Sequence, residues 1–186
     1  MPEFNNREFM SRAQEGYLFP DTYFPRPGES TDAILSVFDN TFRSKISKIQ
    51  KEIKASGHTL EELLTMASIL EKEASKTKDR QQIAGVLWYR VKIGMPLQVD
   101  AVFPYILGKN TFQLTTDDLK FDSPYNTYTN KGLPPGPINT PGLDSILAAA
   151  TPIKSKYLYF LSDKAGNFHY AVTYAQHLAN KKKYLD

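Results

Sequence analysis

Residues 59–75 read TLEELLTMASILEKEAS, and this stretch predicts the central helix of the fold. Thr59 and Glu62 have the spacing of a capping box, in which each side chain satisfies a backbone N–H of the first turn. Apolar residues then recur at helical spacing to about Ser75. The apolar face consists of Leu60, Leu63, Leu64, Ala67, Leu70 and Ala74. Such a face has to be buried against other elements, so the stretch favours a packed helical domain.

Two acids lie near the end of this helix. At about 100° per residue, Glu71 projects into the apolar face, whereas Glu73 lies at its edge beside Met66 and Ile69. An acid that points into the core needs a buried partner such as an arginine or a backbone amide. An acid at an apolar edge has a raised pKa and can serve as a general acid if a substrate reaches it. Periodicity does not decide which glutamate is catalytic, and a solvated charge is the ordinary alternative for either.

The rest of the chain predicts an α+β fold that is mainly helical. Two apolar segments flank the turn sequence DKAGN and indicate a β-hairpin. The helices are expected at Thr31–Ala55, Asp79–Ile93, Thr115–Leu119, Leu143–Ala150 and Tyr174–Lys183, and the strands at Lys156–Ser162 and Phe168–Val172. We expect Gly57 and Gly94 to end the helices that precede them.

The composition narrows the classes of function. The chain of 186 residues has a net charge of +3 and no cysteine, which excludes disulfides, thiol catalysis and cysteine-bound metal. The charge is too balanced to argue for nucleic acid. His58, His169 and His177 show no metal-ligand spacing, and we expect them at the surface or as helix caps. No apolar run approaches the ~20 residues of a membrane span.

Residues 125–142 form a second informative segment, YNTYTNKGLPPGPINTPG. Prolines fix the backbone and glycines permit tight turns, so we expect a shaped loop. Its amides and hydroxyls, with a single lysine, suit a neutral polyhydroxylated ligand such as a sugar chain. An ordinary surface crossing between helices is the alternative.

Several blocks of this sequence together resemble the YceG-like family of endolytic murein transglycosylases. The blocks occur in the order of the family and cover nearly the whole chain from Glu15. They are EGYLFPDTY (15–23), MASILEKEAS (66–75), RVKIGMPLQVDAV (90–102), SPYNTYTNKGLPPGPINTPGLDSILAAATP (123–152) and YLYFLSD (157–163).

The resemblance implies an enzyme that cuts nascent peptidoglycan between N-acetylmuramic acid and N-acetylglucosamine. It leaves 1,6-anhydro-muramic ends and thereby terminates glycan polymerisation. The family's catalytic acid is the second glutamate of its E-K-E motif, here Glu73, on a helix similar to that of lysozyme-like transglycosylases. One carboxyl suffices, because the C6 hydroxyl of the muramic sugar is the nucleophile. We therefore expect no metal and no cofactor.

We expect six further residues to bind the substrate. Polar side chains of the proline-rich loop could contact an N-acetyl group or the charge that develops on the sugar, although a loop-shaping role is equally open. Gln98 and Asp100 follow a turn and could face the cleft, or could merely cap that turn. The six residues are Glu71, Gln98, Asp100, Tyr125, Asn126 and Tyr128.

The resemblance also implies a location and partners. Such proteins are single-pass proteins of the cell membrane whose catalytic domain faces the wall, beside peptidoglycan synthases (penicillin-binding proteins). Neither the N-terminal anchor nor the usual LysM-like lobe is recognisable here, so we expect residues 1–186 to form one catalytic domain. The alternative function is a peptidoglycan-binding module without turnover. An exchange of Glu73 for Gln would separate the two.

Overall fold

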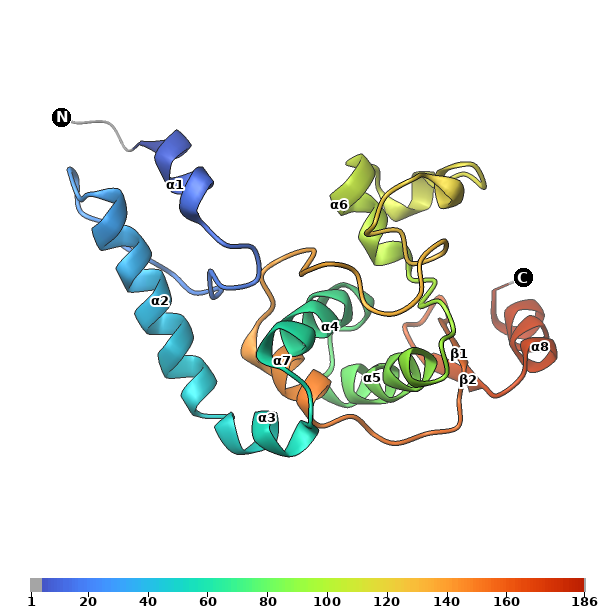
Figure 1. Cartoon of the computed structure of the whole chain (residues 1–186). Helices are drawn as coiled ribbons and strands as arrows, with labels where there is room; N and C mark the ends of the chain where they lie inside the picture. The colour runs from blue at the N-terminus through green and yellow to red at the C-terminus, as the bar shows by residue number, and fades with distance from the viewer. Residues whose placement is uncertain (1–4, 186) are drawn as a thin grey trace.

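Helix α4 (Leu60–Glu73) lies at the centre of the fold in the computed structural model, which describes residues 5–185 (Figure 1). Every residue of α4 from Leu63 to Leu70 is buried. Helix α7 (Leu143–Ala150) packs across α4 and α5 (Thr77–Lys92), and also contacts α3 (Gln50–Ser56). The predicted central helix is therefore covered on more than the one apolar face.

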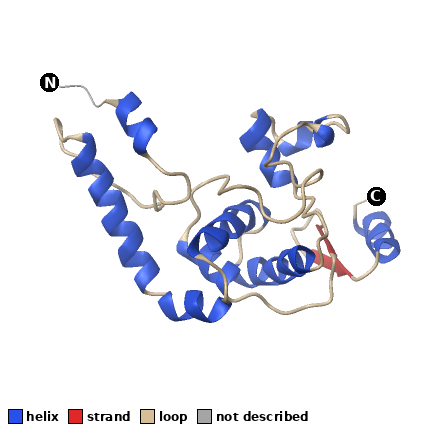
Figure 2. Ribbon diagram, viewed as in Figure 1, coloured by secondary structure: helices blue, strands red, loops and turns tan. Residues whose placement is uncertain are grey.

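The described chain is mainly helical with one small sheet, as the sequence predicts (Figure 2). The hairpin pairs β1 with β2 in antiparallel register, from Tyr159↔Ala171 to Ser162↔Phe168. Helix α8 packs against both strands. The remaining elements are α1 (Asn6–Arg12), α2 (Thr31–Ser47), η1 (Asp100–Val102), α6 (Phe103–Leu107), η2 (Thr111–Gln113), η3 (Asp118–Lys120), β1 (Tyr159–Ser162), β2 (Phe168–Ala171) and α8 (Tyr174–Tyr184).

Local signals located several boundaries correctly. Both halves of the capping box at Thr59 and Glu62 are present. Gly57 and Gly94 follow α3 and α5 with φ of 76° and 68°, the left-handed conformation that glycine adopts without strain. Helix α7 spans the predicted residues, and the hairpin lies where DKAGN indicates it.

The prediction of one helix over Thr31–Ala55 is wrong. The structure has two helices, because Ile49 leaves the helical conformation (φ −118°, ψ 20°) between α2 and α3. Ile46, Ile49 and Ile53 are all buried on both sides of this bend. The hydrophobic spacing continues through the bend, which is why periodicity alone did not reveal it.

Other boundaries also differ from the prediction, and strand β1 begins at Tyr159 rather than Lys156. Helix α4 ends at Glu73 rather than Ser75, since Ala74 is extended. Helix α5 begins at Thr77, two residues before the predicted start. The helix expected at Thr115–Leu119 is only the short 3-10 turn η3, and the Asp118 carboxylate accepts hydrogen bonds from the backbone and hydroxyl of Thr115 before it.

The proline-rich loop is held to α4 by direct hydrogen bonds. The Ser68 hydroxyl accepts a bond from the backbone N–H of Ile138 (3.0 Å), and the Ser68 carbonyl accepts one from the Asn139 side chain (2.7 Å). The loop is thus shaped by the central helix as well as by its own prolines.

Within residues 5–185, none of the helices combines the length and apolarity that a membrane crossing requires.

Candidate active site at the end of helix α4

Glu73 is the last residue of α4, and its carboxyl faces a groove of about 480 Å³. The chain turns to an extended conformation at Ala74, and the Arg80 Nε donates a hydrogen bond to the Ala74 carbonyl (2.8 Å). Polar and charged residues share the groove with aromatic residues of the hairpin. The lining comprises Glu73, Arg90, Gln98, Val99, Asp100, Tyr128, Tyr159, Phe160, Leu161, Ser162, Phe168, Tyr174, His177, Lys181 and Leu185.

The surroundings of Glu73 favour its protonated form. Burial raises the pKa of Glu73 from the ordinary value of 4.5 to about 7, and the negative charge of Asp100 adds to this effect. Among the described residues, the Glu73 carboxyl has no hydrogen-bond partner, so its proton is free for a ligand in the groove. At pH 7 about half of the molecules keep this proton, against about 1 in 300 for a carboxyl of ordinary pKa.

Asp100 and Tyr128 form a pair beside Glu73. The Tyr128 hydroxyl donates to the Asp100 carboxylate (2.5 Å), and burial together with this bond raises the pKa of Tyr128. The segment before Asp100 is fixed, because the Thr127 hydroxyl bonds both the N–H and the carbonyl of Val99. Gln98 has a φ of 49°, a conformation that residues other than glycine rarely adopt. The pair is thus placed by the backbone around it.

Glu71 lies outside this groove and is bonded to the start of α7. Its carboxylate accepts hydrogen bonds from the Gly142 N–H (3.2 Å) and the Ser145 hydroxyl, and lies 3.6 Å from the Arg80 guanidinium. These are the arginine and backbone-amide partners expected of an acid pointing into the core. A carboxylate is also favourable at a helix N-terminus. Substrate binding by Glu71 stays a prediction.

The other predicted binding residues divide between the groove and the loop. Gln98, Asp100 and Tyr128 line the groove with Glu73. Asn126 is fully buried, and its amide donates to the carbonyls of Leu119 and Phe121 while its oxygen accepts from the Tyr128 N–H.

Tyr125 packs instead against Tyr105, with ring centroids 5.0 Å apart, and does not line the groove. The contacts of Asn126 are those of the loop-shaping role that the sequence left open.

Sequence reasoning missed the basic part of the groove. Arg90, His177 and Lys181 line it, although the sequence indicated a surface or capping role for His177. Arg90 lies within the RVKIGMPLQVDAV block, and the resemblance of this block to the family was the only feature of the sequence that could have pointed to Arg90. Of the other histidines, His58 stacks on Trp88 at 3.7 Å and His169 bonds Asp163 at 2.9 Å.

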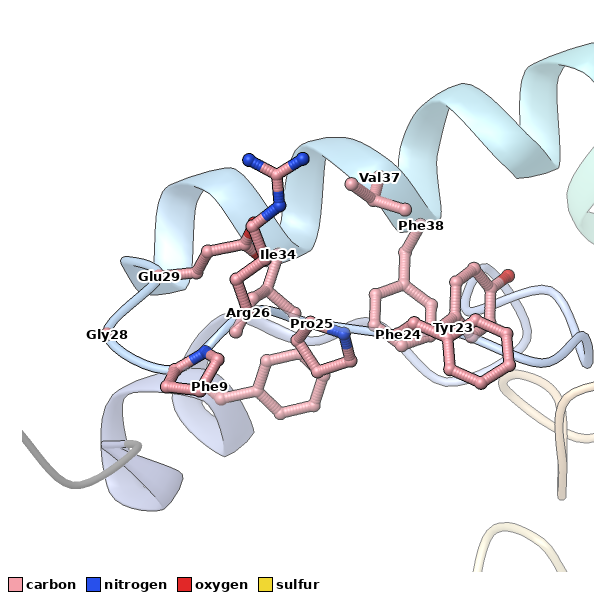
Figure 3. A pocket seen from close by; sticks show the side chains of 11 residues that line it. Phe9, Tyr23, Phe24, Pro25, Arg26, Gly28, Glu29, Ile34, Val37 and Phe38 are labelled. Carbon is pink, nitrogen blue, oxygen red and sulfur yellow. The ribbon is translucent and has the colours of Figure 1, made fainter.

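A second hollow of about 490 Å³ lies between α1, α2 and the segment 23–29 (Figure 3), and it shares no lining residue with the groove at Glu73. Its walls are mostly aromatic and aliphatic, with Phe9, Tyr23 and Phe38 among them. Among the described residues, the lining of this hollow contains one carboxylate, that of Glu29. We therefore place the candidate active site at Glu73. The described residues contain no group of three or more His, Asp or Glu placed to hold a metal ion.

Comparisons with known proteins show what the chain is similar to. The sequence model of the YceG-like family matches residues 2–183. The endolytic murein transglycosylase of Bacillus subtilis (strain 168) is 42% identical over 172 residues, which are 92% of this chain and 48% of that protein. The endolytic murein transglycosylase of Streptococcus pneumoniae serotype 2 (strain D39) is 38% identical over 178 residues, with 92% of this chain and 32% of that protein covered.

A crystal structure of a YceG-like protein from Listeria monocytogenes superposes with a TM-score of 0.81 at 38% identity. The match covers 96% of this chain and 60% of that one. The chain thus spans about half or less of the length of these two curated relatives.

Proposed function

The chain belongs to the YceG-like family, and on that premise we propose that it is the catalytic domain of an endolytic murein transglycosylase. The proposed reaction cleaves nascent glycan strands between N-acetylmuramic acid and N-acetylglucosamine. The observation that carries the proposal is the raised pKa of Glu73, about 7, in a groove lined by a second acid and by aromatic residues.

In the proposed first step, the Glu73 carboxyl protonates the glycosidic oxygen as its bond to the muramic C1 breaks. Positive charge then develops on the sugar ring. Asp100, held by the Tyr128 hydroxyl, supplies a fixed negative charge close to Glu73 that favours this state. The Tyr128 bond keeps the carboxylate in place without neutralising it.

In the second step, the C6 hydroxyl of the same sugar attacks C1 while the Glu73 carboxylate takes its proton. The C1–oxygen bond to the leaving sugar is replaced by a C1–O6 bond, and Glu73 recovers its proton without consuming water. Attack within one ring needs no second molecule to be positioned. One carboxyl is therefore sufficient, in contrast to the two that glycoside hydrolases commonly use.

We propose that this chemistry acts at the wall side of the cell membrane. There it would shorten strands made by neighbouring peptidoglycan synthases and so end their growth. The anchor and the LysM-like lobe of the family would belong to a longer protein, consistent with the partial coverage of the relatives. In this proposal, residues 1–186 form one catalytic domain.

The test is mass spectrometry of strands, made by a purified synthase, after incubation with this chain. We expect anhydro-muramic ends at internal positions, and no cleavage by the Glu73→Gln variant. Free reducing ends would show that water is the nucleophile and would refute the transglycosylase mechanism. Strand binding by the unmodified chain without any cleavage would instead support a binding module.

A further inference from the structure

The groove that holds Glu73 is polarised between acids and bases. Its acids, Glu73 and Asp100, come from the end of α4 and from η1. Its bases, Arg90, His177 and Lys181, come from α5 and α8. The acids have a role in the proposed chemistry, whereas a neutral glycan gives the bases nothing to pair with.

Arg90 is a buried cation without a counterion. The residue is 5% exposed, and its guanidinium donates to the carbonyls of Leu158 (2.6 Å, from Nε), Leu97 (2.5 Å, from Nη1) and Pro96 (3.4 Å, from Nη1). Among residues 5–185, no carboxylate pairs with it, and its Nη2 has no hydrogen-bond partner. Buried charges are normally paired because desolvation is costly. A guanidinium that lines a groove in this condition is prepared for an anion supplied by a ligand.

His177 and Lys181 extend this basic site along α8. The His177 Nδ1 is buried and has no hydrogen-bond partner among the residues that the structure describes. The His177 ring stacks on Tyr159 with centroids 5.4 Å apart, and the Arg90 guanidinium lies 5.3 Å from the centroid of the same Tyr159 ring. Lys181 follows His177 by four residues and so lies on the same face of the helix. Burial, with the positive charges of Arg90 and Lys181, lowers the pKa of His177.

We infer that Arg90, His177 and Lys181 form an anion subsite that receives a carboxylate of the peptide attached to the muramic sugar. This inference rests on the proposed function. While the peptide is attached, the lactyl carboxyl of the muramic sugar is an amide and the sugar chain is uncharged, so the free carboxylates are those of the peptide. A groove that holds both the acid and the anion subsite would select strands that still carry their peptides.

A phosphate could pair with the same two cations, Arg90 and Lys181, and nascent strands carry a pyrophosphate at their lipid-linked end. That group occurs once per strand, whereas endolytic cleavage requires recognition at many internal sugars. We therefore commit to the peptide carboxylate. The experiment therefore includes lipid-linked strands without peptides, so that binding of the pyrophosphate at this site would be detected.

The first measurement is binding, which does not depend on turnover. The Glu73→Gln variant is titrated with peptide-bearing strands and with the same strands after an amidase has removed the peptides. The amidase leaves one lactyl carboxylate beside each muramic ring, so the comparison asks whether the subsite takes the carboxylates of the peptide rather than this one. We expect the peptide-bearing strands to bind about 3- to 10-fold more tightly, and the difference to shrink at high salt. Adding Lys181→Gln should reduce the ratio towards one.

The matched control is Lys182→Gln, which removes the same charge from the next residue of α8, outside the groove lining. It should leave the ratio unchanged. Equal binding of both kinds of strand, or equal effects of the two lysine variants, would overturn the inference. A Lys181 effect that persists only on lipid-linked strands without peptides would assign the site to pyrophosphate and would overturn it as well.

The second measurement is the rate of cleavage by the unmodified chain on the same pair of substrates. Anhydro ends formed on peptide-free strands would support the proposed function whatever the lysine variants show. Cleavage of both substrates at one rate would therefore refute the subsite alone. Absence of cleavage from both would refute the proposed function, while the binding ratio would still decide the subsite.

Discussion

The Glu73→Gln exchange should stabilise the protein at alkaline pH while it abolishes catalysis. The unfolded chain ionises this carboxyl near its ordinary pKa of 4.5, whereas the folded chain does so only near 7. Between these values the unfolded state loses the proton first, so the stability of the folded state falls as the pH rises. Above pH 7 the full penalty of holding a buried carboxylate is present. Glutamine has the same shape and never ionises.

The size of the effect follows from the two pKa values. Their separation corresponds to at most about 3 kcal/mol, since one pKa unit is worth about 1.4 kcal/mol. Glu73 keeps part of its surface open to the groove, and solvent screening reduces this amount. We expect a gain of about 1–2 kcal/mol above pH 8, which is roughly 3–6 °C in the melting temperature of a domain of this size.

The assay is thermal unfolding of both proteins at pH 5 and at pH 8.5, followed by circular dichroism. The melting temperatures should agree at pH 5, where the folded carboxyl is still protonated, and differ at pH 8.5 in favour of the variant. A variant that melts lower at pH 8.5, or a difference that is the same at both pH values, would refute the reasoning. It would mean that Glu73 is solvated or has a stabilising partner.

Three further outcomes can be measured on the same material. Glu71→Gln should lower the free energy of unfolding, measured in urea at pH 8.5, by about 1–3 kcal/mol, because the donors at the start of α7 lose a charged acceptor. This change has the opposite sign to that of Glu73→Gln, and changes of the same sign in both variants would contradict the roles of the two acids. Asp100→Asn removes the charge that raises the Glu73 pKa, so the alkaline limb of the cleavage rate should move to lower pH, and an unmoved limb would exclude this coupling. Gly85→Ala would place a Cβ 1.9 Å from the Ile153 carbonyl oxygen. Overpacking should therefore lower the free energy of unfolding, obtained from the melting curve, by about 1–3 kcal/mol. An unchanged melting curve would mean that the backbone near Ile153 moves without cost.

The sequence predicted the elements whose boundaries are encoded locally. The capping box at Thr59, the turn DKAGN and the residues around α7 each act within a few positions, and the structure has a helix or hairpin at each. The break between α2 and α3 carries no glycine or proline. Its cause is tertiary, because the bend keeps Ile49 and Ile53 against the core while the chain turns.

The site was predicted less completely than the fold, since its members are distant in the sequence. Tyr128 meets Asp100 across 28 residues, and no local pattern encodes that pairing. Arg90 at the end of a helix resembles an ordinary solvated cap. Only the structure shows it buried, with its guanidinium at the groove. The distinction between Glu71 and Glu73 could be stated from periodicity, but their partners could not.

The two glutamates depend on one another through the chain that joins them. Glu73 has no hydrogen bond of its own among residues 5–185, so its position must be fixed by its neighbours. Glu71 anchors the last turn of α4 to α7, and Arg80 binds both the Glu71 carboxylate and the carbonyl of Ala74, the residue after the candidate acid. A general acid that spent its proton on an internal hydrogen bond would be a poorer donor to a substrate. Placing the fixing contacts on the residues around Glu73 allows the carboxyl to be both held in position and free to transfer its proton.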